Sequence, residues 1–220
     1  MVVPLKRCVV IGASPEADAE FIRESVGGDD FVVCADGGYI TALRAGLEID
    51  LLIGDFDSSD YPEGFGGEVI RLPVMKDDTD TLSCVRECLR RGYRDFVLLG
   101  MTGGRIDHTF ANYSVLLFVA ENGGRAAISD RTSEITALTG GTDGKDFLTV
   151  SNKQGRGFGV FPFGCRSCRV TLRGFLYDIE EAELFADIPV GACNTVVSEE
   201  ALVRVSDGSA IVMLYESNQK

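Results

Sequence analysis

The sequence predicts an α/β fold: an N-terminal α/β domain built on a parallel sheet, followed by a smaller all-β sandwich domain. Two observations predict it. Over about the first 140 residues, short β-branched runs alternate with helical patterns, the order typical of parallel strands joined by crossover helices. Beyond that point, glycine and proline separate short strand-like runs, and the 3.6-residue period fades. We place the domains at residues 1–142 and 143–220.

Six runs are the candidate strands of the first domain. Each is nearly continuous in apolar residues, as expected of strands that are covered on both faces. They are Cys8 to Ile11, Phe31 to Cys34, Leu51 to Ile53, Val69 to Leu72, Phe96 to Leu99 and Ala126 to Ser129.

Two helices stand out between these strands. One follows Asp80, and Gly92 suits the cap beyond its carboxyl end. Its expected apolar face consists of Leu82, Val85 and Leu89. The other runs from about His108 to Glu121.

The second domain is expected to contain only strands. Its candidates are Phe147 to Val150, Gly159 to Phe161, Val170 to Leu172, Leu202 to Val205 and Ala210 to Leu214. A turn at Ser206-Asp207-Gly208 joins the last two.

Composition excludes several classes of function. The formal charge of −13 repels nucleic acid and anionic membranes, so we expect neither as a partner. Apolar runs such as Val115 to Ala120 are far shorter than the roughly 20 residues of a membrane span. Seven cysteines, an odd number spread through apolar segments, favour reduced thiols and a cytoplasmic protein. The N-terminal residues lack the pattern of a signal peptide.

Aspartate is concentrated where the predicted strands end. The segments concerned are Ala35-Asp36-Gly37-Gly38, Gly54-Asp55-Phe56-Asp57-Ser58, Lys76-Asp77-Asp78-Thr79-Asp80 and Gly100-Met101-Thr102-Gly103-Gly104-Arg105-Ile106-Asp107-His108. In an open parallel sheet, ligands bind beyond the carboxyl ends of the strands. We therefore infer that the four segments converge on one crevice.

Three of these acids suit a metal ion. Asp55 and Asp57 lie two residues apart directly after a buried strand, and Asp80 comes from the next strand end. Hard carboxylate oxygens are ligands for Mg²⁺, which also keeps waters and phosphate oxygens. The sequence thus predicts a magnesium site formed by Asp55, Asp57 and Asp80.

Other residues of the crevice suit a polyphosphate. Lys76 and Arg105 supply positive charge, and Arg105 has the geometry to grip phosphate oxygens in a bidentate way. Four glycines allow close approach of the backbone and expose amide donors: Gly37, Gly38, Gly103 and Gly104. His108, the only histidine, is either a proton shuttle or a polar residue at a helix start. Neither a P-loop nor a dinucleotide fingerprint is present.

The ordered motifs resemble the thiamine pyrophosphokinase family. They are Asp36-Gly37-Gly38, Gly54-Asp55-Phe56-Asp57-Ser58, Lys76-Asp77-Asp78-Thr79-Asp80 and Gly103-Gly104-Arg105-Ile106-Asp107-His108, with Asn112 one helical turn on. The resemblance implies a homodimer that converts thiamine and ATP, with Mg²⁺ as cofactor, to thiamine diphosphate and AMP.

The resemblance also implies roles for individual residues. The catalytic set is Asp55, Asp57, Asp80, Arg105 and Asp107. The ATP-binding set is Asp36, Gly37, Gly38, Lys76, Thr79, Gly103, Gly104, His108 and Asn112. The thiamine-binding set is Tyr177, Cys193 and Asn194. Tyr177 stands where the family often has tryptophan, and Cys193 where it usually has serine.

Two other readings stay open at this point. The Asp-x-Asp motif after a strand also fits an aspartyl-phosphate phosphatase, in which Asp55 is a covalent nucleophile. A thiamine or nucleotide sensor that binds without turnover is the non-enzymatic alternative. The products formed from ATP and thiamine distinguish all three.

Overall fold

The computed structural model describes residues 7–56, 65–75, 77–141 and 144–217. Contacts divide the chain into two compact units. The first runs to Val115 and includes residues 122–131, and the second consists of Leu116–Glu121 and the chain from Thr132 onward. The division precedes β7 (Ser133–Thr139), which pairs with β14 (Ser209–Tyr215), whereas the sequence placed the boundary after it, at residue 142.

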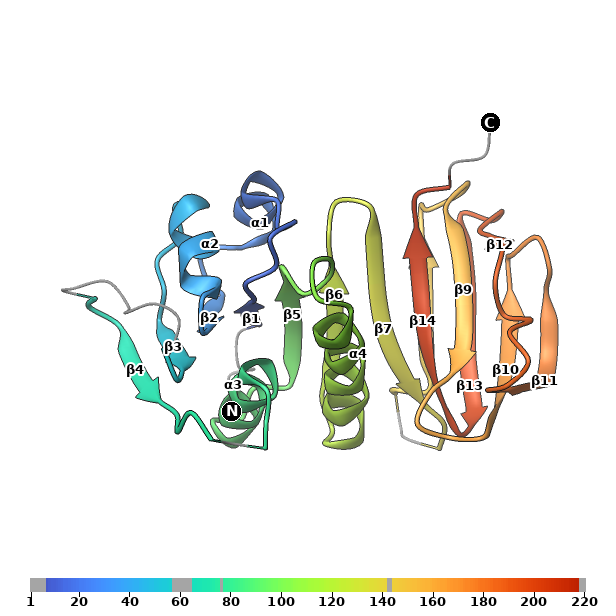
Figure 1. Cartoon of the computed structure of the whole chain (residues 1–220). Helices are drawn as coiled ribbons and strands as arrows, with labels where there is room; N and C mark the ends of the chain where they lie inside the picture. Colours follow the sequence, from blue (N-terminus) through green and yellow to red (C-terminus); the bar gives the residue numbers. More distant parts are fainter. Residues whose placement is uncertain (1–6, 57–64, 76, 142–143, 218–220) are drawn as a thin grey trace, which may run out of the picture. The chain divides into compact units, whose positions relative to one another are not determined.

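The first unit is built on a parallel sheet with strand order β6-β5-β1-β2-β3-β4 (Figure 1). The strands are β1 (Cys8–Ile11), β2 (Phe31–Ala35), β3 (Leu51–Gly54), β4 (Glu68–Arg71), β5 (Asp95–Leu99) and β6 (Arg125–Ser129). All six predicted strands are therefore confirmed, with ends shifted by at most one residue. The expectation that each strand is buried on both faces is wrong for β4. Its side chains are exposed or half-buried because it is the edge strand.

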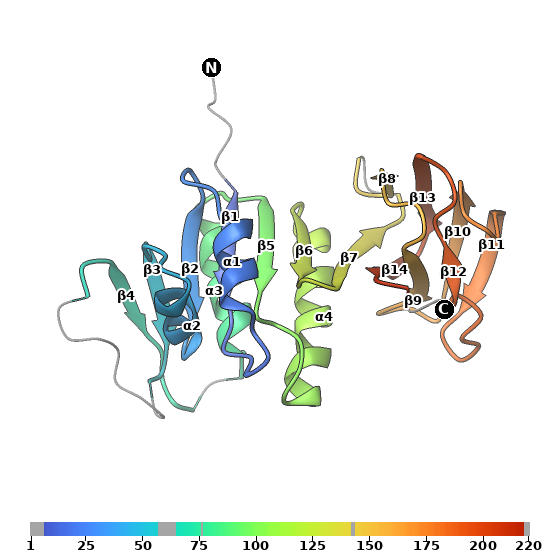
Figure 2. The same cartoon turned by 90° about the horizontal axis from the view of Figure 1, so that it is seen from above.

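Helices cover both faces of this sheet. They are α1 (Ala19–Ser25), α2 (Gly38–Arg44), α3 (Asp80–Arg90) and α4 (Ile106–Glu121). Figure 2 shows α1 and α2 on one face and α3 on the other. Residues of α1 and α2 share a core with alternate residues of β1 and β2, among them Ile22, Ala42, Val9 and Cys34. None of the helices in the described part of the chain is long and apolar enough to cross a membrane.

The sequence missed α1 and α2, and it misjudged one helix face. Both missed helices have only seven residues, too few to show a clear period. In α3 the buried residues are Thr81, Cys84, Val85 and Cys88. Leu82 and Leu89 are only half-buried, because the small thiols rather than the leucines face the sheet. Gly92 has the left-handed φ of 98° expected after the helix.

The second unit is an antiparallel sandwich. One sheet has the order β12-β9-β14-β7 within this unit, and the other has β11-β10-β13-β8. The remaining strands are β8 (Phe147–Ser151), β9 (Gly157–Pro162), β10 (Ser167–Arg173), β11 (Ile179–Phe185), β12 (Asn194–Thr195) and β13 (Glu200–Asp207). Side chains from both sheets form one core, for example Phe158 and Val212 with Val170 and Val203. The predicted fold class is thus confirmed.

The predicted connection at Ser206-Asp207-Gly208 is confirmed. It joins β13 to β14, but these strands belong to different sheets and do not pair. Gly208 has φ of 72°, and a Cβ there would lie 2.6 Å from the carbonyl oxygen of Ser167. The glycine therefore forms a corner between sheets rather than the turn of a hairpin.

Candidate active site

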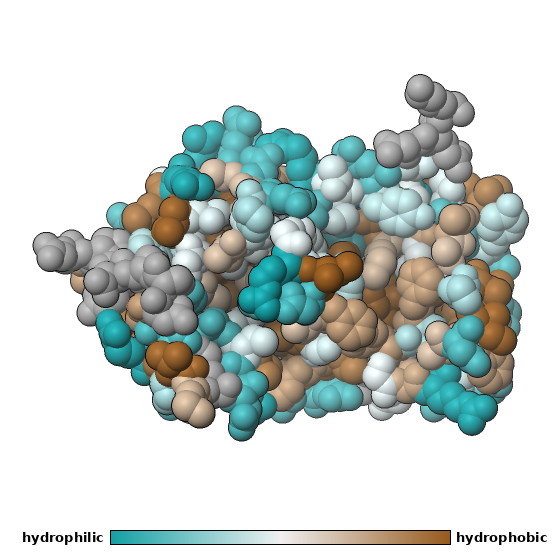
Figure 3. Space-filling model, viewed as in Figure 1, coloured by the Kyte–Doolittle hydropathy of each residue, from teal (hydrophilic) through white to brown (hydrophobic). Residues whose placement is uncertain are grey.

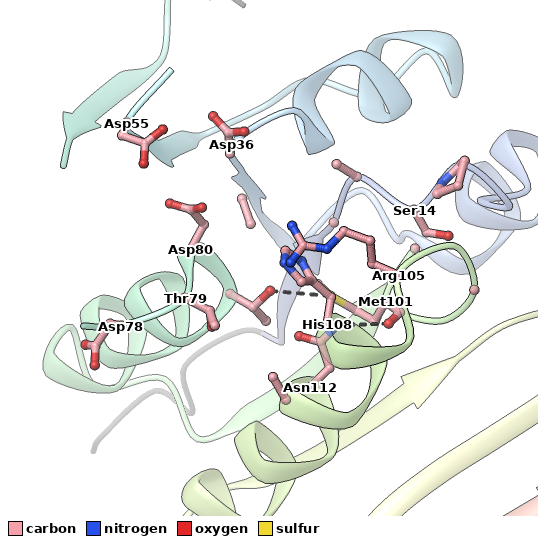
Figure 4. Close-up of a pocket in the computed structure, with 18 of the residues that line it drawn as sticks. Ser14, Asp36, Asp55, Asp78, Thr79, Asp80, Met101, Arg105, His108 and Asn112 are labelled. Carbon is pink, nitrogen blue, oxygen red and sulfur yellow. Dashed lines mark hydrogen bonds between the residues drawn. The ribbon is translucent and has the colours of Figure 1, made fainter. Parts of the chain in front are cut away.

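A pocket of about 460 Å³ lies at the carboxyl ends of the parallel strands in the first unit. Loops after β1, β2, β3, β4 and β5 line it, together with the first turns of α3 and α4. Of the predicted site residues, it is lined by Asp36, Asp55, Thr79, Asp80, Gly103, Arg105, His108 and Asn112 (Figure 4). The inferred convergence of strand ends on one crevice is therefore correct for the described residues.

Three aspartates surround one part of the pocket. Figure 4 shows Asp36, Asp55 and Asp80 together, with Arg105 and His108 elsewhere around the cavity. Asp36 has a left-handed φ of 43°, and its amide donates to the carbonyl of Ile53 at 2.7 Å. Its Oδ1 is buried and has no hydrogen-bond partner among the described residues. This oxygen is an acceptor that a bound ligand or cation could satisfy.

Gly54 makes the position of Asp36 possible. A Cβ at residue 54 would lie 2.8 Å from both Cα and Oδ1 of Asp36. Any side chain there would push Asp36 out of place. Gly54 therefore leaves room for Asp36, which lies at the end of the neighbouring strand β2.

The predicted magnesium ligands are only partly described. Asp55 and Asp80 line the pocket, while Asp57 and Lys76 fall in segments for which the structure gives no description. Among the residues it does describe, no three acidic, histidine or cysteine side chains are grouped closely enough to hold a metal. The set of Asp55, Asp57 and Asp80 stays a prediction.

The two residues before Asp80 are engaged in the structure of α3. Asp78 forms an ion pair with Arg86 at 2.9 Å. The hydroxyl of Thr79 accepts a hydrogen bond from the amide of Leu82 at 3.2 Å and so caps the helix. Both side chains still line the pocket, but each has a structural partner that the sequence did not reveal.

Arg105 and Asp107 bind each other at the start of α4. The guanidinium donates to both carboxylate oxygens, at 2.5 and 3.2 Å. Both side chains are exposed. The hydrogen bond from Arg105 lowers the pKa of Asp107 to about 2 and raises the pKa of Arg105 in return. Arg105 lines the pocket and Asp107 does not, so the structure places Asp107 against Arg105.

Asn112 holds the loop after β5. Its side chain is buried, and its Nδ2 donates to the carbonyl of Met101 at 2.8 Å (Figure 4). The thioether of Met101 accepts from the hydroxyl of Thr81 at 3.8 Å. His108 lines the same pocket from the first turn of α4. Asn112 therefore shapes the pocket through Met101.

The predicted glycines allow close packing of the backbone. A Cβ on Gly38 would clash with the carbonyl of Ile11, so α2 begins directly against the end of β1. Gly103 lines the pocket, whereas Gly37, Gly38 and Gly104 do not. Binding of ATP by these glycines stays a prediction.

The sequence missed the loop after β1. Gly12, Ala13, Ser14 and Pro15 all line the pocket. Ligands bind beyond the carboxyl ends of parallel strands, and this rule applies to the end of β1 as it does to the other strand ends. These four residues carry no charge and match no known nucleotide-binding fingerprint. Position at a strand end was the signal that could have found it.

The predicted thiamine residues lie together in the second unit. Oδ1 of Asn194 accepts from the amide of Tyr177 at 3.0 Å, and its Nδ2 donates to the carbonyl of the same residue at 2.9 Å. Asn194 is buried, whereas Tyr177 is 64% exposed. Cys193 is exposed and has a left-handed φ of 62°. Asn194 thus fixes the segment that presents the Tyr177 ring.

Two family models match consecutive parts of the chain. The thiamin pyrophosphokinase catalytic domain matches residues 23–128, and the thiamin pyrophosphokinase vitamin B1 binding domain matches residues 147–212. Together they cover most of the sequence. The first contains most of the pocket residues, and the second contains Tyr177, Cys193 and Asn194.

Proteins similar in sequence or in structure to this chain are thiamine pyrophosphokinases. Thiamine pyrophosphokinase 1 of Oryza sativa subsp. japonica is 25% identical over 82% of this chain and 76% of its own length. Thiamin pyrophosphokinase 1 of Caenorhabditis elegans is 22% identical over 90% and 85%. The crystal structure of thiamine pyrophosphokinase from Bacillus subtilis has the same fold, with a TM-score of 0.83 at 19% identity over 96% of this chain and all of that one. The chain belongs to the thiamine pyrophosphokinase family.

Proposed function

We propose that this protein transfers the terminal pyrophosphate of ATP to the hydroxyl of thiamine, giving thiamine diphosphate and AMP. Membership of the family supports this reaction. The observation that carries it furthest is one pocket in which Asp36, Asp55 and Asp80 lie opposite the guanidinium of Arg105. In such a site the carboxylates can bind a metal cation, and the guanidinium can bind phosphate oxygens.

The residues of the pocket fit Mg²⁺ as the cofactor. Asp55 and Asp80 offer hard oxygen donors on the same pocket, and the unsatisfied Oδ1 of Asp36 is a further buried acceptor. We propose that Asp55 and Asp80 hold the ion together with Asp57. Bound there, Mg²⁺ would offset the repulsion between the aspartates and the ATP phosphates.

The remaining chemistry is positioning and charge neutralisation, as in phosphoryl transfer generally. The thiamine hydroxyl attacks the β-phosphorus of ATP, and AMP leaves in line. Arg105 binds oxygens of the transferring group, and Asp107 keeps the guanidinium oriented through two hydrogen bonds. An aspartate of the pocket accepts the proton of the hydroxyl.

We further propose that the Tyr177 ring packs on thiamine, beside Cys193 and Asn194. The exposure of this ring on a segment fixed by Asn194 supports the assignment. A cytoplasmic location and a homodimer complete the proposal. All seven cysteines are free thiols, which fits a reducing compartment.

Product analysis tests the reaction. Purified protein is incubated with ATP, thiamine and Mg²⁺, and the products are separated by chromatography. We expect thiamine diphosphate and AMP in equal amounts. Free phosphate with a phosphorylated Asp55 would indicate an aspartyl-phosphate phosphatase, and tight binding with no product at any Mg²⁺ concentration would indicate a sensor. Native mass spectrometry of the same sample tests the homodimer.

A further inference from the structure

The loops after β1 and β5 run side by side and are joined by their backbones. The amide of Gly12 donates to the carbonyl of Leu99 at 2.8 Å, and the amide of Ser14 donates to that of Gly100 at 3.2 Å. A Cβ on Gly12 would lie 2.6 Å from the carbonyl oxygen of Gly100. The position of one loop therefore fixes that of the other.

Two side chains of the first loop continue this attachment. The hydroxyl of Ser14 donates to the carbonyl of Thr102 at 2.5 Å. Oε1 of Glu16 accepts from the amide of Gly104 at 3.1 Å. Gly104 directly precedes Arg105, so the carboxylate of Glu16 holds the Gly103–Gly104 peptide, one residue before Arg105. Figure 4 shows Ser14 next to the loop that carries Met101 and Arg105.

Glu16 holds this loop from outside the pocket. Gly103 and Arg105 line the cavity, whereas Glu16 and Gly104 do not. Gly103 has φ of 85°, and a Cβ there would lie 3.0 Å from the Cβ of Glu16. The two glycines thus allow a turn against which the Glu16 side chain fits. The Gly104 amide is turned toward Glu16 in this arrangement.

The position of Arg105 depends on this turn. Its side chain is 71% exposed, and it binds Asp107, which lies two residues further along the same segment. The ion pair therefore moves together with the backbone that carries it. A carboxylate that accepts from a backbone amide makes a charge-assisted hydrogen bond, stronger than a neutral one.

We propose that Glu16 is a positioning residue for the transfer reaction, holding the Gly103-Gly104 turn so that Arg105 lies in the pocket. The proposal rests on the proposed function for its kinetic readout. Glu16 does not line the pocket, and it acts through the backbone of Gly104. The glycine pair, which the sequence suggested as a phosphate loop, then owes part of its shape to a carboxylate from the loop after β1.

The matched variants are Glu16→Ala and Glu16→Gln. Alanine removes the acceptor, while the glutamine side chain keeps a carbonyl oxygen for the Gly104 amide. We expect Glu16→Ala to raise KM for ATP about three- to tenfold, the range of one net hydrogen bond, with KM for thiamine unchanged. Glu16→Gln, which keeps a weaker, neutral acceptor, should raise KM for ATP less than Glu16→Ala does. Glu20→Ala, which removes another exposed carboxylate from the same unit, is the control and should change neither constant.

A double variant tests whether Glu16 acts through Arg105. In an Arg105→Ala background, Glu16→Ala should have no further effect, because the group that it positions is gone. An equal loss in both backgrounds, a Glu16→Gln variant as impaired as Glu16→Ala, or wild-type constants for Glu16→Ala would each overturn the proposal. Calorimetry measures the affinity of wild type and of the Glu16 variants for Mg²⁺-ATP, and this comparison needs no turnover. It tests Glu16 even if the wild-type protein forms no thiamine diphosphate, a result that would refute only the proposed function.

Discussion

The pocket of the first unit and the Tyr177 segment of the second are built in different ways. Five strand ends and two helix starts, spread from Gly12 to Asn112, supply the pocket. In the Tyr177 segment, the side chain of Asn194 binds both the amide and the carbonyl of Tyr177. The pocket also gathers charge, whereas the Tyr177 segment presents an exposed ring.

This difference suggests a division of labour. Charged groups that reach one place from distant parts of the chain suit chemistry on a polyphosphate, where charge must be balanced. An exposed aromatic ring on a fixed segment suits binding of a flat cationic ring. Changes in the pocket should therefore affect turnover most, and changes in the Tyr177 segment should affect thiamine binding or stability.

The largest expected effect is that of Asp80→Asn. Loss of a charge from the proposed magnesium site should lower kcat/KM at least about 100-fold, since metal-assisted charge stabilisation supplies several kcal/mol. The melting temperature should change little, because the shape is kept. Asp78→Asn is the matched control: it also lines the pocket, but it is paired with Arg86, and it should lose far less activity. Equal losses in steady-state assays would contradict the assignment of Asp80.

Asn194→Ala should have the next largest effect, on stability. It removes two part-buried hydrogen bonds to the backbone of Tyr177, each of which contributes about 0.5–1.5 kcal/mol to the free energy of unfolding. Chemical denaturation measures this loss, and KM for thiamine should rise in parallel. Asn194→Asp keeps the acceptor but not the donor, so it too should be destabilised. A fully stable Asn194→Ala variant would show that the segment does not depend on this side chain.

Tyr177→Ala should act on thiamine alone. Packing of an aromatic ring on a cation contributes about 0.5–2 kcal/mol, so KM for thiamine should rise about three- to thirtyfold. Stability and KM for ATP should stay near wild type because the side chain is largely exposed. Tyr177→Phe keeps the ring and should retain most of the affinity. A similar rise in both Michaelis constants would mean that the two regions are not separate in function.

The smallest expected effect concerns acid stability. Hydrogen bonds from arginine lower the pKa to about 2 in three carboxyl groups of the first unit: Asp18, Glu87 and Asp107. Since these folded-state pKa values are depressed, their stabilisation is present above the unfolded pKa of about 4 and is lost as pH falls through about 2. Solvent screening keeps the contributions of Asp18 and Asp107 small, because these two side chains are exposed.

Glu87→Gln tests this expectation. Between pH 4 and pH 2, its free energy of unfolding should fall less steeply than that of wild type. Glu199→Gln, at an exposed position of the second unit, is the control and should follow the wild-type curve. Identical slopes for wild type and Glu87→Gln would show that the ion pairs of Glu87 with Arg90 and Arg91 add nothing to stability.

The sequence by itself determined the fold class, the six parallel strands and most of the charged residues of the pocket. Buried parallel strands must be continuous apolar runs, and that local pattern is legible without coordinates. The rule that ligands bind beyond strand ends then brought Asp36, Asp55, Asp80 and Arg105 together. The sequence did not predict the short helices α1 and α2 or the polar strand β11, because their local hydrophobic pattern is weak.

Only the tertiary structure decided what each pocket side chain touches. Thr79 caps a helix, Asp78 pairs with Arg86, and Asn112 holds Met101. The contact between Glu16 and Gly104 joins residues 88 positions apart. The physical reason is that a hydrogen bond requires its donor and acceptor to be placed to within a few tenths of an ångström, even when they lie far apart in the chain. Residue type and spacing indicate which groups come near one another, but the packing of the sheet and helices selects the partners.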